Sequence, residues 1–201
     1  MTPAPTPQTK RGLAPWTTRD LLVIAVIALV SAMVLYGLSL IYTPLAAVAT
    51  PLIANALLGG LFFLPSALAI YVTRRPGAAF LAQVLASLAQ IPFSPLGLGL
   101  VIGGVIGGVL AELPFFITRY RRFSLRFMML AGAIFNVLNV LISGAFAGGA
   151  DLTAGVIGIG IVLTVLSGAA GGWLACSLAH ALVRAGVFGS TTISHSQTTE
   201  I

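Results

Sequence analysis

Residues 21–73 read LLVIAVIALVSAMVLYGLSLIYTPLAAVATPLIANALLGGLFFLPSALAIYVT and carry no charged side chain over 53 positions. A membrane-spanning helix needs about 20 apolar residues, so this stretch is long enough for two crossings. Helix-breaking residues cluster from Tyr42-Thr43-Pro44 to Thr50-Pro51 and predict a turn there. The stretch therefore predicts two helices that cross a lipid bilayer.

Three further charge-free stretches extend the same pattern along the chain. They cover residues 76–111, 127–150 and 152–183. The first contains a Pro- and Gly-rich break at 91–97, and Asp151 marks a turn between the other two. Six membrane helices are therefore expected, at Asp20–Ile41, Leu52–Thr73, Gly77–Ile91, Gly97–Thr118, Phe127–Gly148 and Thr153–Arg184.

The composition excludes an ordinary water-soluble domain. Charged residues make up 7% of the 201 residues, whereas soluble domains contain about 25%. Hydrophobic residues make up 58%, so most surfaces must face lipid or protein. The fold class expected is an all-α integral membrane protein. Its expected parts are a flexible tail over residues 1–18, a six-helix transmembrane domain over 19–186 and a second flexible tail over 187–201.

The basic residues predict how the chain is oriented. Cytoplasmic loops are enriched in Lys and Arg, and the expected loops on one side hold all ten basic residues of this chain. Both termini are therefore expected in the cytoplasm, with the protein in the cell membrane. The net charge of +6 is explained by topology rather than by nucleic-acid binding. The basic residues are Lys10, Arg11, Arg19, Arg74, Arg75, Arg119, Arg121, Arg122, Arg126 and Arg184.

Several common catalytic motifs are absent from the sequence. Lys10 is the only lysine, so the chain cannot form a P-loop, and energy for any transport must come from a partner or a gradient. The chain contains neither Cys-x-x-Cys nor His-Glu-x-x-His, and His180 and His195 are its only histidines. We therefore expect no enzymatic activity, no metal site and no bound cofactor.

Polar residues within apolar helices are costly unless they face the protein interior or a cavity. Asn136 and Asn139 share one helix face, and Gln83 and Gln90 share another. With Tyr36 and Asn55 they are candidates for a substrate pocket that opens outward. The alternative is that these amides only form hydrogen bonds between helices.

Two other residues are candidates for a role in substrate binding. Glu112 is the only acid inside an expected span. It is a candidate for three roles: a counter-charge for a cationic ligand, a proton carrier, or the salt-bridge partner of an arginine. The arginines considered are Arg74, Arg75 and Arg119. Trp173 falls near the middle of its helix, which favours stacking or core packing over an interfacial position.

Small residues recur at a spacing of four on several expected helices. Such faces allow two helices to approach closely. For the glycine pairs, which include Gly104 with Gly108 and Gly168 with Gly172, packing inside the bundle is expected. Ala28 and Ala32 lie on a helix whose other residues are large and apolar, so docking to a partner protein is a serious alternative to packing for this pair.

Four segments resemble a known family. They are Gly60-Leu-Phe-Phe-Leu-Pro65, Tyr71-Val-Thr-Arg-Arg-Pro-Gly-Ala-Ala79, Ala111-Glu-Leu113 with Arg119-Tyr-Arg-Arg-Phe-Ser124, and the stretch from Ser167-Gly168 to Gly186-Val187. Together they resemble the YkoE family of substrate-binding S components of energy-coupling factor (ECF) transporters. The similarity extends from about Trp16 to Phe188.

The resemblance implies a function and a set of partners. An S component captures thiamine or its hydroxymethylpyrimidine precursor outside the cell, and a membrane T subunit with two ATPase subunits drives release inside. Ala28 and Ala32 resemble the motif that docks on the T subunit. Gln83 and Gln90 stand where the resemblance implies carboxylates, and amides suit a neutral pyrimidine better than cationic thiamine.

Two other functions remain possible from the sequence. A non-transporting membrane assembly subunit needs the amides only as links between helices. A proton-coupled carrier of small solutes needs Glu112 as its proton carrier. The site expected for an S component consists of Tyr36, Asn55, Gln83, Gln90, Asn136, Asn139, Trp173 and Glu112, with Ala28 and Ala32 for docking.

Overall fold

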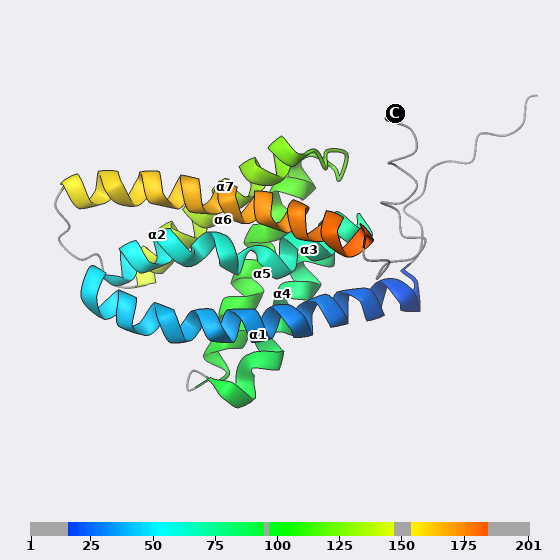
Figure 1. Cartoon of the computed structure of the whole chain (residues 1–201), viewed down its shortest axis with the longest axis horizontal. Helices are drawn as coiled ribbons and strands as arrows, with labels where there is room; N and C mark the ends of the chain where they lie inside the picture. Colours follow the sequence, from blue (N-terminus) through cyan, green and yellow to red (C-terminus); the bar gives the residue numbers. More distant parts are fainter. Residues whose placement is uncertain (1–15, 95–96, 147–153, 185–201) are drawn as a thin grey trace, which may run out of the picture.

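The computed structural model describes residues 16–94, 97–146 and 154–184, and over these ranges the chain is helical. Most of the two expected tails lies outside these ranges. The elements are α1 (Thr18–Ala49), α2 (Pro51–Phe62), α3 (Leu64–Thr73), α4 (Ala78–Gln90), the 3₁₀ turn η1 (Ile91–Phe93), α5 (Gly99–Ile117), α6 (Leu125–Phe146) and α7 (Ala154–Arg184). Figure 1 shows α1 and α7 on opposite sides of the molecule, α2 and α3 between them, and α4 and α5 crossing their direction.

The described helices confirm an all-α protein with several membrane spans. Five spans are long and apolar enough to cross a bilayer: Thr18–Ala49, Pro51–Thr73, Gly99–Ile117, Leu125–Ala145 and Gly158–Leu182. The sixth expected span is α4, which with η1 forms a shorter apolar helix over Ala78–Phe93. A sixth full crossing therefore stays a prediction.

The first helix is longer than its sequence predicts. It begins with a capping box, in which the Thr17 hydroxyl accepts from the Asp20 N–H and the Asp20 carboxylate accepts from the Thr17 N–H. It then continues through Pro44 to Ala49, so the expected end at Ile41 is wrong. The chain turns instead at Thr50, where φ is +90°. Proline is tolerated inside membrane helices, since neighbouring groups satisfy the freed backbone.

The second expected helix is in fact two helices in one span. The prediction of one continuous helix over Leu52–Thr73 is wrong, because the chain breaks at Phe63 between α2 and α3. Pro65 lacks the N–H that would bond to the Leu61 carbonyl, which accounts for the break. At the break the Phe63 N–H bonds instead to the Gly60 carbonyl.

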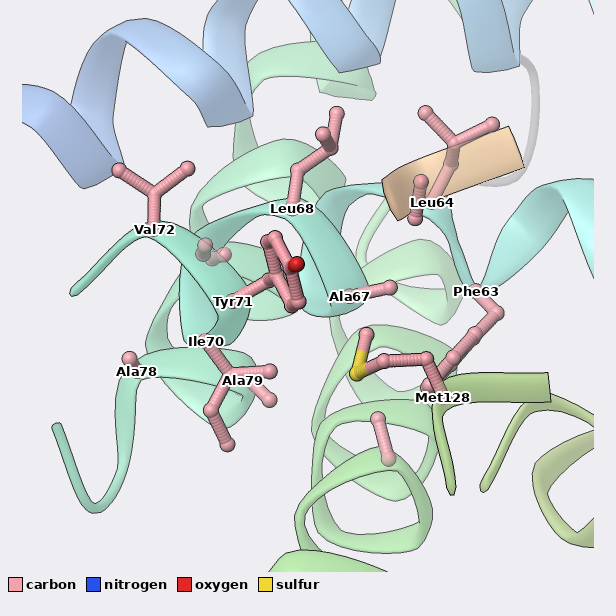
Figure 2. Close-up of a cluster of buried hydrophobic side chains, with 14 of the residues drawn as sticks. Phe63, Leu64, Ala67, Leu68, Ile70, Tyr71, Val72, Ala78, Ala79 and Met128 are labelled. Atoms are coloured by element: carbon pink, nitrogen blue, oxygen red, sulfur yellow. The ribbon is translucent and has the colours of Figure 1, made fainter. Parts of the chain in front are cut away.

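The core of the protein is centred on α3. Every residue of α3 is buried, and Figure 2 shows its side chains pointing in all directions into the surrounding helices. At its start, Phe63 packs on Phe135 of α6 with ring centroids 5.0 Å apart. Near its end, the Tyr71 hydroxyl contacts His180 Nε2 of α7 at 3.3 Å. A helix that is apolar all round is typical of a bundle centre.

Close glycine contacts join the helices around this core. A methyl group at Gly60 would overlap the Ser167 carbonyl of α7, and one at Gly104 would overlap the Ser87 side chain of α4. Gly168 and Gly172 lie directly against the α6 backbone, as the spacing predicts. Small residues at these positions let the backbones approach closely, which strengthens packing where lipid provides no hydrophobic drive between helices.

The segments that carry the described basic residues lie at one end of the bundle. Arg75 forms a salt bridge with Asp20 at the start of α1, with Nη2 and Oδ2 3.1 Å apart. The Arg74 guanidinium lies 5.3 Å from the ring centroid of Phe123, just before α6. The contact of Tyr71 with His180 brings the last turns of α7 to the same end. Whether this end faces the cytoplasm stays a prediction.

Candidate functional site

The polar side chains of the spans form separate groups. One group lines the buried face of α4, a second joins α2, α6 and α7, and a third surrounds Glu112 at the basic end. The structure therefore divides the predicted site residues between different parts of the bundle. Each group is described from its contacts below.

The buried face of α4 carries three polar residues in one stripe. Gln83, Ser87 and Gln90 are all buried, as their spacing over two turns predicts for a single face. The Ser66 hydroxyl of α3 donates to Gln83 Oε1 at 2.9 Å, and Gly107 of α5 lies against the same side chain. Gln83 is thus held between three helices.

An aromatic pair lies next to the far end of this stripe. The ring of Tyr36 on α1 and the ring of Phe93 in η1 have centroids 5.7 Å apart and are tilted by 50°. Gln90, three residues before Phe93, donates from Nε2 to the Ala86 carbonyl of its own helix at 3.1 Å. Tyr36 and Gln90 are therefore both found where α1 meets the end of α4.

Asn136 links three helices. Its side chain is fully buried, and Nδ2 donates to the Ala56 carbonyl of α2 at 3.2 Å and to the Thr164 carbonyl of α7 at 2.9 Å. Among the described residues its Oδ1 has no hydrogen-bond donor, and it lies against Gly59. These contacts favour the alternative role for this amide, a bond between helices.

Asn139 and Asn55 lie on the two helices that Asn136 joins. Asn139 is half-buried one turn further along α6, and its Oδ1 accepts from the Ser143 hydroxyl at 3.2 Å. Asn55 is half-buried on α2, next to the Ala56 carbonyl that Asn136 bonds. The structure thus brings Asn55 and Asn139 to neighbouring helices, separate from the α4 stripe.

Glu112 caps the start of α4. Its Oε1 accepts from the Gly77 N–H at 2.6 Å and from the Tyr120 hydroxyl at 2.7 Å, and its Oε2 accepts from the Phe80 N–H at 3.1 Å. The first N–H groups of a helix have no partner within the helix, and a negative charge is stabilised there. These contacts give Glu112 a structural role at the start of α4. Its partners are two backbone N–H groups and a phenol, whereas the sequence suggested an arginine.

The contact with Glu112 changes the pKa of Tyr120. Tyr120 lies in the connection between α5 and α6 with φ of +56°, and its side chain is half-buried. Burial, together with the hydrogen bond to the Glu112 carboxylate, raises the pKa of Tyr120 well above its usual value of 10. The phenol therefore stays protonated and remains a hydrogen-bond donor to Glu112.

Trp173 lies on the outside of the bundle. Its side chain is 51% exposed and lines a shallow apolar groove between α2 and α7. This groove has a volume of about 430 Å³ and includes Leu57, Leu61 and Leu174. The structure places Trp173 apart from the described amides, in a position that suits contact with lipid.

Ala28 and Ala32, the expected docking residues, lie between α1 and α4. Both side chains are at least 96% buried, and they pack with Leu35 against Ala86 of α4. The small residues allow α1 and α4 to approach closely, which is the bundle-packing alternative. Docking of a partner protein through these two methyl groups stays a prediction.

Three polar residues at the described sites were not found from sequence. Ser66 bonds Gln83, and the backbone carbonyl of Thr164 bonds Asn136. Ser87 completes the stripe on α4 and lies four positions from Gln83, a spacing that would have revealed it. No group of three or more His, Cys, Asp or Glu residues able to hold a metal ion occurs within residues 16–94, 97–146 and 154–184.

A protein family matches most of this helical framework. The family described as "ABC-type cobalt transport system, permease component" matches residues 19–138, which include α1 to α5 and the first half of α6. The chain belongs to this family. It is therefore a multi-pass membrane protein of the permease class.

Two individual proteins are similar over nearly the whole chain. "Putative HMP/thiamine permease protein YkoE" of Bacillus subtilis (strain 168) is 29% identical over 180 residues, which cover 89% of this chain and 90% of the relative. A crystal structure of an S component of an ECF transporter matches with a TM-score of 0.84 and 27% identity. The structural match covers 92% of this chain and 95% of the other. The resemblance to the YkoE family is therefore confirmed.

Proposed function

We propose that this chain is the substrate-binding S component of an ECF-type importer for thiamine or its hydroxymethylpyrimidine precursor. The observation that carries the proposal is the match to a solved S component with a TM-score of 0.84 over 92% of the chain. The name of the Bacillus subtilis relative supports the choice of substrate. This relative covers more of the chain than the family match, whose description names cobalt.

The chemistry of the polar residues is consistent with a heteroaromatic substrate. Amides donate and accept hydrogen bonds without adding charge, which suits the ring nitrogens and amino group of a pyrimidine. The aromatic pair of Tyr36 and Phe93 provides apolar surface for a planar ring. Nickel- and cobalt-type ions instead prefer imidazole and other strong donors, and the chain contains only two histidines and one cysteine.

We propose different roles for the site residues, and their contacts support the division. We infer that Tyr36, Gln83 and Gln90 orient the substrate at the α1–α4 contact, with Asn55 and Asn139 as further ligands from α2 and α6. Asn136 and Glu112 support the site indirectly, since their side chains already bond backbone groups of other helices. Trp173 faces outward and is assigned no substrate contact.

The transport cycle requires partners. The chain has no P-loop, so a T subunit and two ATPase subunits on other chains supply the energy, and the S component itself catalyses no reaction. The basic end faces the cytoplasm of a prokaryotic cell in this proposal, in keeping with the excess of arginine in its loops. Six crossings, with both termini inside, complete the topology.

Ligand-dependent melting tests the proposal directly. A ligand that binds only the folded protein raises its stability by about 2.7 kcal/mol at a hundredfold excess over Kd. We expect hydroxymethylpyrimidine or thiamine to raise the melting temperature of the detergent-purified chain, and riboflavin to leave it unchanged. A shift with riboflavin alone would contradict the substrate, and no shift with any of them would favour an assembly subunit without a pocket.

A further inference from the structure

An apolar groove runs along the outer surface of the α4–α5 pair at the basic end of the bundle. It has a volume of about 380 Å³ and is lined by Phe80 on α4 and by Val109, Leu113 and Phe116 on α5. Glu112 and Tyr120 also line it. The carboxylate of Glu112 bonds two backbone N–H groups and a phenol, so its charge is compensated locally.

One lining residue of this groove, Tyr120, lies within a cluster of arginines along the chain. Arg119 and Arg121 flank Tyr120 in the chain, and Arg122 and Arg126 follow within six residues. All four side chains are exposed. Both described carboxylates are engaged elsewhere, Asp20 with Arg75 and Glu112 with the start of α4. Within the described residues, these four arginines therefore have no acidic partner.

The N-terminus of α6 adds to the electrostatic repulsion within the arginine cluster. Helix N-termini carry a partial positive charge and favour acidic residues in the first turn. The first turn of α6 contains Arg126 and no acidic residue. The cluster is therefore a region in which a bound anion would lower the electrostatic free energy of the folded protein.

An apolar groove that includes Tyr120, together with exposed arginines on both sides of Tyr120 in the chain, indicates the kind of ligand. A free phosphate would satisfy the arginines and leave the groove without a function. An acidic soluble segment would match the charge but not an apolar surface on the membrane-facing side, where Phe116 is 69% exposed. An amphiphile with an anionic head and an apolar tail satisfies both features.

We propose that this surface is a binding site for an anionic phospholipid. The phosphate group contacts the arginines of residues 119–126, and one acyl chain lies in the groove between Phe80 and Phe116. Arginine forms bidentate bonds with phosphate oxygens, which favours this headgroup contact. Of the proposed substrate residues on α4, Gln83 lies one turn after Phe80 but is buried, and Gln90 lies at the opposite end of the helix from the groove.

Lipid retention by the purified full chain tests the proposal. Detergent-solubilised protein is incubated with dioleoyl phosphatidylglycerol or dioleoyl phosphatidylcholine, and bound lipid is counted by native mass spectrometry. Each arginine near an anionic surface contributes about fivefold in affinity, so we expect phosphatidylglycerol to be retained at least fivefold better. Equal retention of the two lipids would overturn the proposal.

Two sets of variants separate the headgroup contact from the acyl contact. Replacing Arg121, Arg122 and Arg126 with glutamine is expected to remove the preference for phosphatidylglycerol, whereas the same three positions as lysine keep most of it. Val109→Trp fills the groove and is expected to lower phosphatidylglycerol retention severalfold. Val30→Trp, on the exposed face of α1, is the matched control. Unchanged preference in the glutamine variant, or unchanged retention in Val109→Trp, would contradict the site.

Water-soluble phosphates test whether the arginines bind an anion without the acyl chain. Inorganic phosphate and glycerol phosphate at millimolar concentration should not raise the melting temperature, whereas phosphatidylglycerol should. A rise with inorganic phosphate as large as that with the lipid would mean that the arginines bind phosphate without the groove, and would overturn the lipid assignment. All substituted arginines are exposed, so the lipid-free glutamine variant should melt at or slightly above the melting temperature of the original chain, because it loses only the repulsion within the cluster.

Discussion

Glu112 shows how a single charged residue is accommodated among apolar helices. An ionised carboxylate within a membrane protein is expensive unless donors surround it. Here the donors are the N–H groups of Gly77 and Phe80 and the hydroxyl of Tyr120, all within 3.1 Å. The carboxylate of Glu112 thus accepts the hydrogen bonds that the first N–H groups of α4 need. This arrangement argues against a role as a freely exchanging proton carrier.

Substitution of Glu112 is expected to reduce stability rather than to abolish substrate binding. Glu112→Ala removes three hydrogen bonds to a charged acceptor, and we expect a loss of about 2 kcal/mol or more. Glu112→Gln keeps one acceptor oxygen and should lose less. Thermal melting in detergent, with and without ligand, measures both effects. Loss of ligand binding in Glu112→Gln at unchanged melting temperature would instead support a functional acid.

Tyr120 predicts a pH dependence. Its folded pKa is raised above the unfolded value of about 10, so the folded state retains a proton that the unfolded state loses. Its contribution to stability is therefore fully present below pH 10 and is lost as the pH rises through the folded pKa. The melting temperature of the original chain should therefore begin to fall toward that of Tyr120→Phe as the pH rises above 10. A constant difference between the two would contradict this account.

The proposed substrate residues predict a separation between binding and stability. Gln90→Ala and Asn139→Ala should weaken ligand binding by tenfold or more with little change in ligand-free melting, because neither side chain bonds another helix among the described contacts. Asn136→Ala should lower the ligand-free melting temperature, because it removes bonds to α2 and α7. Isothermal titration and melting scans distinguish the two. Unchanged affinity in both Gln90→Ala and Asn139→Ala would remove these residues from the site.

At the scale of helices, the differences from sequence expectations all involve proline. The helix breakers from Tyr42-Thr43-Pro44 to Thr50-Pro51 predict a turn with a helix end at Ile41, yet α1 continues through Pro44 and the chain turns only at Thr50. The segment around Pro65 predicts no break, yet α2 ends just before it. Proline removes one hydrogen bond in either case, and neighbouring helices decide whether the helix continues. That choice depends on contacts between distant residues and so cannot be read from the local pattern.

Glycine contacts predict which helix pairs are sensitive to a single methyl group. Gly60→Ala should strongly lower the melting temperature or prevent folding, because its Cβ would overlap the Ser167 backbone of α7. Gly103→Ala on α5 is the control, since nothing described lies within 4 Å of its Cβ and alanine favours helices over glycine by about 1 kcal/mol. Expression and melting scans of the two variants provide the comparison. Equal stability of both would contradict the close α2–α7 contact.

For the whole molecule, the sequence predicts the framework better than the site. Charge-free stretches locate the helices because lipid imposes length and apolarity on each span. The same reasoning finds Gln83 and Gln90 on one face, which the structure confirms as buried. It cannot decide that Asn136 bonds α2 and α7 or that Ala28 and Ala32 contact α4, because these contacts join residues at least 28 positions apart.

The orientation of the whole molecule is open to a direct test. The single native cysteine, Cys176, is buried, so labelling of the original chain should be weak. A cysteine at exposed Leu98, beyond the end of η1, should react with an impermeant maleimide in intact cells. A cysteine at Arg121 should react only after the membrane is opened. The reverse pattern would place the basic end outside and contradict the proposed topology.

The bond between Glu112 and Gly77 has a mechanical consequence. These residues are 35 positions apart, and their contact closes the α4–α5 segment into a ring at the end opposite its connecting loop. A disulfide would close such a ring covalently, but this protein has one cysteine and closes it with hydrogen bonds to a carboxylate. When the chain is pulled from the membrane by its C-terminus, α4 and α5 should therefore leave together, in one step of force rather than two.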